Sequence, residues 1–175
     1  MNKEECIAVE EYAKAVRANY DVKVPFFESI DYLLEKLGGN LEITELDCFG
    51  SSKLYLRTAI WEELFTVKVK PSVSREKRNY EIAKQIGHLF LHTTYVDAMT
   101  EEKPLLITDD LSDTVNEAQA NIFADTLVMP QDEFTKEVKQ NVHDGRVDMK
   151  KVAKKFGVTY DRALVRASRL NLIEW

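Results

Sequence analysis

The sequence has few cysteines, no long apolar run and no repeated segment. Its two cysteines, Cys6 and Cys48, stand far apart and outside any CxxC spacing, which argues against a disulfide framework and a zinc knuckle. No stretch approaches the roughly 20 apolar residues of a membrane span, and the N-terminal stretch is charged throughout. Internal repeats and low-complexity tracts are missing as well. We therefore expect a cytoplasmic protein with no membrane partner.

The sequence does contain enough apolar material for a folded core. Of its 175 residues, 45% are hydrophobic, which suits one compact unit with a small appendage. The formal net charge of -6 argues against wholesale binding of nucleic acid or of an anionic membrane. The charge is uneven, because eight basic residues stand against three acidic ones from Gly145 onward. That segment carries +5, so the remainder carries -11.

The apolar pattern predicts an α+β fold, with a mostly helical core, a small and largely antiparallel three-stranded sheet, and a helical C-terminal subdomain. Helices are predicted over residues 3–20 and from Pro25 to the Gly38-Gly39 pair, which are favourable start and stop residues. Three β-like runs follow at residues 41–46, 53–60 and 63–70.

The rest of the chain reads as helices. Ser72 or Ser74 can cap a mostly buried helix from about Arg75 to Thr94, and an irregular acidic connection, EEKPLLITDD, follows it. Ser112 or Asp113 can cap the next helix, which ends at Met129-Pro130. The remaining predicted elements are a polar helix over residues 131–142, a turn at residues 143–145, and two short helices divided at Gly157.

The stretch KQIGHLFLH, residues 84–92, stands where a zinc-peptidase motif would be. In an H-E-x-x-H helix, two histidines four residues apart bind one zinc ion, and the glutamate accepts a proton from the metal-bound water. Here Lys84 takes the place of the first histidine, Gln85 takes the place of the glutamate, and His88 remains. Taken alone, a single histidine on a buried helix is usually a core residue.

The segments RNYEIAKQIGHLFLHTTY and NEAQANIFADTLVMP resemble the ImmA/IrrE family of zincin-like metallopeptidases. Members of that family carry an A-H-E-[LI]-G-H-x-x-L-H helix followed by an E-A-x-x-F-A-x-x-[LF]-[LM]-M-P helix. The residues that fit this pattern are Ala83, Gly87, His88, Leu91, His92, Glu117, Ala118, Asn121, Phe123, Ala124, Met129 and Pro130.

The resemblance implies roles for particular residues and a division of the chain. His88 would be the second zinc ligand and Glu117 the third, with Lys84 at the first-ligand position and Gln85 at the general-base position. The implied domains are N-terminal helices over residues 1–39, a zincin-like core over 40–135, and a helical, helix-turn-helix-like subdomain over 136–175 packed on that core.

The two substitutions predict a site without zinc and without hydrolysis. A protonated lysine has no lone pair for zinc, and the loss of a general base costs ~10²–10⁴-fold in rate. Lys84 lies one turn from His88, so its ammonium can occupy the vacant position and pair with Glu117. An alternative is an active zinc peptidase with a shifted site made of His88, His92 and Glu117.

The spacing of apolar residues around a turn in the basic C-terminal segment is typical of a helix-turn-helix, so DNA binding is a further alternative. Its lysines, Lys150, Lys151, Lys154 and Lys155, would suit contacts to DNA phosphates. In the family, however, similar segments pack on the core. By resemblance, we expect a catalytically degenerate metallopeptidase-like regulator of a bacterial phage or mobile element. It would bind a protein partner such as a helix-turn-helix repressor without cleaving it.

Overall fold

The fold was analysed in a computed structural model, which describes residues 1–46, 50–56, 64–101 and 104–173. The elements in chain order are α1 (Lys3–Asn19), η1 (Phe26–Glu28), α2 (Ile30–Lys36), β1 (Gly39–Ile43), β2 (Ser52–Leu56), β3 (Phe65–Val69), α3 (Arg75–Leu91), α4 (Tyr95–Glu101), α5 (Thr114–Val128), α6 (Gln131–Gln140), β4 (Val142–His143), β5 (Arg146–Val147), α7 (Met149–Phe156) and α8 (Tyr160–Arg169). The α+β class is confirmed. None of the helices in the described part of the chain has the length and apolar character to cross a bilayer.

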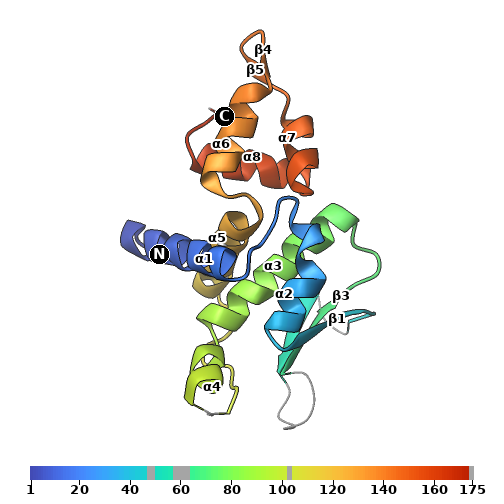
Figure 1. Ribbon diagram of the computed structural model, residues 1–175, viewed down its shortest axis with the longest axis vertical. Helices are drawn as coiled ribbons and strands as arrows, with labels where there is room; N and C mark the ends of the chain where they lie inside the picture. The colour runs from blue at the N-terminus through green and yellow to red at the C-terminus, as the bar shows by residue number, and fades with distance from the viewer. Residues whose placement is uncertain (47–49, 57–63, 102–103, 174–175) are drawn as a thin grey trace.

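Helices α3 and α5 cross at the centre of the molecule, with α1 against α5 (Figure 1). Gly87 lets them approach closely, because a Cβ there would lie 3.2 Å from the Ala120 carbonyl oxygen and 3.2 Å from the Phe123 Cβ. The Ser74 hydroxyl caps α3, and the Asp113 carboxylate caps α5. Each cap is one of the two candidates that the sequence offers. Helix α3 ends at Leu91, three residues before the predicted end.

The sheet is mixed, so the prediction of a largely antiparallel sheet is wrong in one of its two pairings. The strand order is β1-β3-β2, with β1 parallel and β2 antiparallel to β3. Strands β1 and β2, although successive in the chain, do not pair with each other, because β2 lies on the far side of β3 from β1. Strand β3 is central and buried. Residues 57–60 of the second predicted strand lie outside the described residues.

Helix α4 is an element that the sequence analysis did not assign. The Tyr95 side chain is buried and its hydroxyl donates to the Leu37 carbonyl oxygen at 2.9 Å. The backbone on either side is tied down, because the Thr94 amide donates to Leu106 and the Thr108 amide donates to His92. These are contacts between distant segments, which leave no local signal in the sequence.

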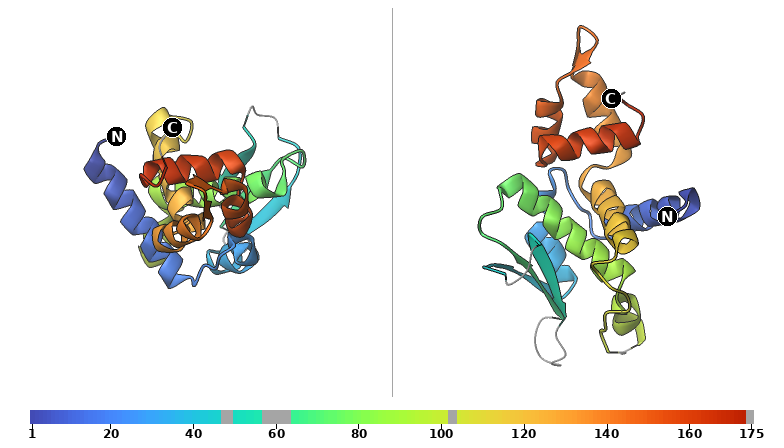
Figure 2. Two further views of the ribbon diagram at one scale, coloured as in Figure 1. Left: turned by 90° about the horizontal axis from the view of Figure 1, so that it is seen from above. Right: turned by 180° about the vertical axis from the view of Figure 1, so that it is seen from behind.

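The predicted helix pair near the C-terminus is present as α7 and α8. Gly157 ends α7 in the left-handed conformation (φ 65°), and the Thr159 hydroxyl caps α8. Two views from other sides show these helices with α6 at one end of the molecule, over the N-terminal end of α3 (Figure 2). Helix α8 is tied to α5 through Asp125, whose carboxylate is fully buried and accepts from Arg162 and Arg169, each at 2.8 Å.

Candidate functional site

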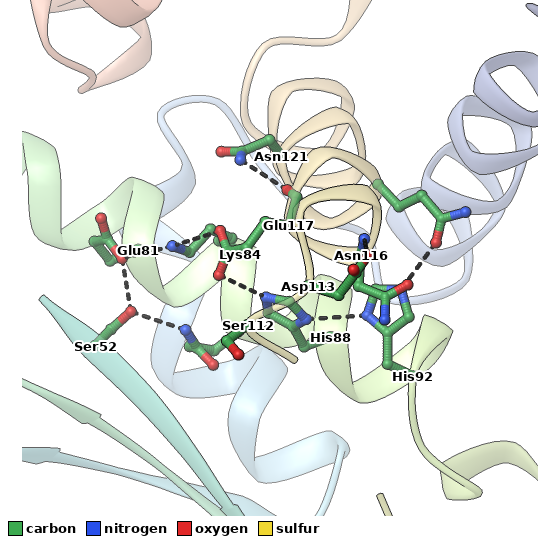
Figure 3. Close-up of polar contacts among 12 residues, drawn as sticks. Ser52, Glu81, Lys84, His88, His92, Ser112, Asp113, Asn116, Glu117 and Asn121 are labelled. Carbon is green, nitrogen blue, oxygen red and sulfur yellow. Dashed lines mark hydrogen bonds and ion pairs between the residues drawn. The ribbon is translucent and has the colours of Figure 1, made fainter. Parts of the chain in front are cut away.

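The predicted site residues from α3 and α5 come together between the two helices (Figure 3). Lys84, His88 and His92 follow one another at four-residue spacing, so their side chains lie along one face of α3 and at its end. Glu117 projects from the first turn of α5 toward that face. The side chains of Lys84, His88 and Glu117 therefore face one another in the space between the two helices.

Lys84 stands between two carboxylates. Its Nζ lies 3.2 Å from Glu117 Oε2 and 3.4 Å from Glu81 Oε2. The side chain is only 17% exposed, so the ammonium relies on these partners for much of its solvation. The ion pair between Lys84 and Glu117 that the sequence predicts is present. Glu81, one turn earlier on α3, was missed, although its i,i+3 spacing from Lys84 is a signal that could have found it.

The second oxygen of Glu117 faces His88. His88 Nε2 lies 3.4 Å from Glu117 Oε1, and the imidazole is buried with 1% exposure. The hydrogen bond from His88, together with the charge and hydrogen bond of Lys84, lowers the pKa of Glu117 to about 2. Both carboxylate oxygens are thus committed to partners within the protein.

The ring nitrogens of the two histidines take part in a chain of hydrogen bonds and do not point at one common centre. His88 Nδ1 and His92 Nδ1 are 3.0 Å apart, and His92 Nε2 lies 2.9 Å from Gln119 Oε1. Burial is the main cause of a lowered pKa at His92. The neutral ring donates through Nε2 to Gln119 and accepts at Nδ1 from His88.

The side chains as arranged do not fit a zinc ion. A zinc site needs three or four donor atoms within about 2.0–2.3 Å of one point. His88 uses one ring nitrogen toward Glu117 and the other toward His92, so the shifted set of His88, His92 and Glu117 has no common centre. No group of three or more His, Cys, Asp or Glu side chains suited to a metal occurs among residues 1–46, 50–56, 64–101 and 104–173. Lys84 offers no lone pair at the first-ligand position.

Gln85 has a structural partner where a general base would act. Its Nε2 donates to Ser52 Oγ at 2.9 Å, and Ser52 Oγ donates to Glu81 Oε2 at 2.6 Å. These bonds connect α3 to strand β2 (Figure 3). Sequence reasoning did not find Ser52, because nothing local marks a serine on a strand as the neighbour of a helix residue 33 positions away.

A second set of hydrogen bonds links α3 to α5 next to the Lys84 side chain. The Tyr80 hydroxyl donates to the Asn121 side chain at 3.0 Å, and the Asn121 Nδ2 donates to the Glu117 carbonyl oxygen at 2.7 Å. Arg162 of α8 also contacts the Tyr80 hydroxyl. Burial and the negative charge of Asp125 raise the pKa of Tyr80 well above its ordinary value, so its phenol stays protonated.

The four lysines predicted for phosphate contacts, Lys150, Lys151, Lys154 and Lys155, are exposed on α7. The site residues of α3 and α5 lie elsewhere in the molecule. The arginines of α8 face inward: Arg162 and Arg169 bind Asp125, and the buried Arg166 contacts Glu10 and the Met129 carbonyl oxygen. DNA binding through this segment stays a prediction that would rest on α7 alone.

A search of curated proteins gives no significant match. The family model described as the IrrE N-terminal-like domain, of the peptidase M78 family, matches residues 53–168, about two thirds of the chain. The match begins in β2 and ends in α8, so it contains every residue of the α3 and α5 site. The family is zinc-dependent in general, and the chain belongs to this metallopeptidase-related IrrE N-terminal-like family.

Proposed function

We propose that this chain is a catalytically degenerate member of its family, which binds a protein segment without cleaving it. The observation that carries the proposal is the position of the Lys84 ammonium, 3.2 Å from Glu117 and 3.4 Å from Glu81. A positive charge of the chain itself stands where the family holds a cation. Glu117 keeps its negative charge with that partner and needs no metal.

Hydrolysis lacks both of its chemical requirements at this site. A metal-bound water needs a first ligand with a lone pair, and an ammonium has none. The attack of that water needs a proton acceptor, and the Gln85 amide is not one. Gln85 instead donates its amide hydrogen to Ser52. The two changes support a binding role over a catalytic one.

We assign the partner to the β2 edge of the sheet, where no further strand pairs among the residues that the structure describes. Strand β2 is the last in the order β1-β3-β2, and Ser52 anchors it to Glu81 of α3. Glu81 belongs to the Lys84 cluster, which we define as Lys84, Glu81, His88 and Glu117. The Lys70 amide donates to the Ser51 carbonyl oxygen. Since paired residues alternate along an antiparallel ladder, the backbone groups of Leu54 and Leu56 point away from β3. An extended segment can add to such an edge as a further strand.

The identity of the partner is proposed from the family resemblance. Family members are often encoded beside helix-turn-helix repressors in mobile elements, and several inactivate such a repressor. We infer that this chain belongs to a phage-type element of bacteria and sequesters a repressor of this kind. Failure to detect a complex with any co-encoded repressor would count against this partner but not against the loss of catalysis.

Metal content tests the loss of catalysis. Elemental analysis would compare the untagged protein with the double variant Lys84→His/Gln85→Glu, which restores the family motif. We expect little zinc in the protein and about one zinc per chain in the double variant, because three ligands then converge. Zinc near one per chain in the unchanged protein would overturn the proposal and favour the shifted site.

Hydrogen exchange on the complex tests the binding mode. The backbone amides of Leu54 and Leu56 should exchange rapidly in the free protein and slowly in the complex. The amides of Lys53 and Tyr55 point toward β3, so they should be protected in both states and serve as the internal control. A complex that leaves Leu54 and Leu56 unprotected would rule out strand addition at β2.

A further inference from the structure

In the C-terminal segment, the arginines of α8 are paired with acidic residues, whereas the lysines of α7 are exposed. The arginines of α8 are engaged by Asp125 and Glu10. On α7, Lys151 lies 3.6 Å from Asp148, and Lys155 lines a separate hollow with Glu133 and Glu137. Lys150 and Lys154 remain, one turn apart on a face that turns toward α3.

That face forms one wall of a groove of about 440 Å³. The groove lies between α7 and the N-terminal end of α3, with Phe27 of η1 and Tyr160 of α8 at its sides. Among the residues that line it, Arg75, Lys150 and Lys154 are cationic and Glu76 is the acidic residue. The volume is within the range of ligand-binding pockets, and the lining carries a net positive charge.

Contacts between α3, α7 and η1 hold the groove in shape. The Asn79 side chain is buried and donates to the Gly157 carbonyl oxygen at 3.0 Å, which fixes the end of α7 to α3. Gly157 has a φ of +65°, and a Cβ there would lie 3.1 Å from the Phe27 ring, so glycine favours both the backbone conformation and the close approach. The Arg75 guanidinium stacks 4.1 Å from the centre of the same ring, which directs one of the cations.

The lining favours an acidic peptide over nucleic acid. Single-stranded nucleic acid stacks successive bases on aromatic rings, whereas Arg75 covers a face of the Phe27 ring and Tyr160 is the other aromatic residue of the lining. In a helix-turn-helix, a DNA duplex would be read by the second helix, here α8, whose arginines are already engaged by Asp125 and the Met129 carbonyl oxygen. The rest of the chain also carries net negative charge. That charge repels a long polyanion more than a short one, so a short acidic ligand is favoured.

We propose that this basic groove, defined by Arg75, Lys150 and Lys154, binds a short acidic segment of a protein partner. Carboxylates of the segment would pair with the two lysines and form a two-pronged contact with Arg75. The inference does not depend on the state of the Lys84 cluster, which involves none of these residues. The groove would serve as a second contact for a partner held at β2, or as a docking site in its own right.

The test is fluorescence anisotropy with the full-length protein and a short labelled glutamate-rich peptide. The double variant Lys150→Ala/Lys154→Ala removes two cations of the groove, and Arg75→Gln removes the third. The matched control is Lys151→Ala/Lys155→Ala, which removes two lysines at the same spacing on the same helix but outside the groove. Thermal unfolding would confirm that all variants remain folded.

We expect the groove variants to weaken peptide binding by about tenfold and the control variant by less than about twofold. Equal weakening by both double variants would mean that only general charge attraction is measured, and would overturn the proposal. An oligonucleotide of equal charge that binds more tightly than the peptide would overturn it in favour of nucleic acid. Absence of saturable peptide binding to the unchanged protein would also overturn it.

Discussion

Lys84 is the positive neighbour of two carboxylates between α3 and α5. The Glu117 carboxylate is only partly exposed, so it depends on that charge for part of its stabilisation. The ammonium supplies the charge from the helix that would carry the first zinc ligand. This pairing could be predicted from the sequence, because both positions follow from the motif. The bond from Gln85 to Ser52 could not, because it depends on where β2 lies against α3.

Neutralising Lys84 should destabilise the protein. In Lys84→Met the stem remains and the charge is lost, so Glu81 and Glu117 face each other without a cation. We expect a loss of about 1–3 kcal/mol in the free energy of unfolding, measured by denaturant titration. Lys136→Met on the exposed face of α6 is the control and should stay within about 0.5 kcal/mol. A similar small effect at both positions would refute the role of Lys84 as an internal counterion.

The carboxylate of Glu117 should make stability depend on pH in the acid range. Its pKa is about 2 in the folded protein against an ordinary 4.5, so the unfolded chain takes up the proton first as the pH falls. The stabilisation is therefore complete above about 4.5 and is lost toward about 2. Unfolding curves of the protein and of Glu117→Gln should converge over this window. Parallel curves would show that Glu117 contributes nothing to it.

At the level of elements, the close crossing of α3 and α5 determines which side chains can meet at the site. The helices could be predicted, since their caps and apolar stripes are local features of the sequence. The parallel pairing of β1 with β3 could not, because strand direction depends on the path between strands. Helix α4 was missed for a similar reason, since its Tyr95 is held by the distant Leu37.

Gly87→Ala tests the crossing. In an open helix this change stabilises by about 1 kcal/mol, because alanine favours the helix more than glycine does. Here the new methyl group would meet the Ala120 carbonyl oxygen and Phe123 Cβ, both at 3.2 Å, so we expect a net loss of about 1–3 kcal/mol. Thermal unfolding gives the sign directly. Increased stability would mean that α5 moves aside without cost.

At the level of the whole molecule, Asp125 joins the central helix pair to the C-terminal helices. The carboxylate is fully buried and binds two arginines of α8. The basic composition of the segment was visible in the sequence, but not its division between α8 arginines used inside the fold and α7 lysines left on the surface. That division depends on the face that α8 turns toward α5.

Removing the charge of Asp125 should loosen the C-terminal helices first. Asp125→Asn leaves Arg162 and Arg169 without a carboxylate, and we expect a loss of about 3 kcal/mol in stability. Hydrogen exchange should accelerate in α8 more than in α3. Asp144→Asn is the control, because that residue lies exposed in the β4–β5 turn with φ 49°. Uniform acceleration across both helices would show that Asp125 supports the whole core equally.

The hydroxyl of Ser52 has one proton, and it is donated to Glu81 while Gln85 donates to its oxygen. A glutamate at position 85 would bring a second carboxylate to a hydroxyl with no further proton to give. In the unchanged background, restoring that glutamate alone therefore breaks a connection between helix and sheet without restoring a metal. Restoring histidine at position 84 alone removes the cation that Glu81 and Glu117 share. Under the proposed loss of catalysis, each single change toward the family motif would therefore lower stability before a complete set of zinc ligands is present.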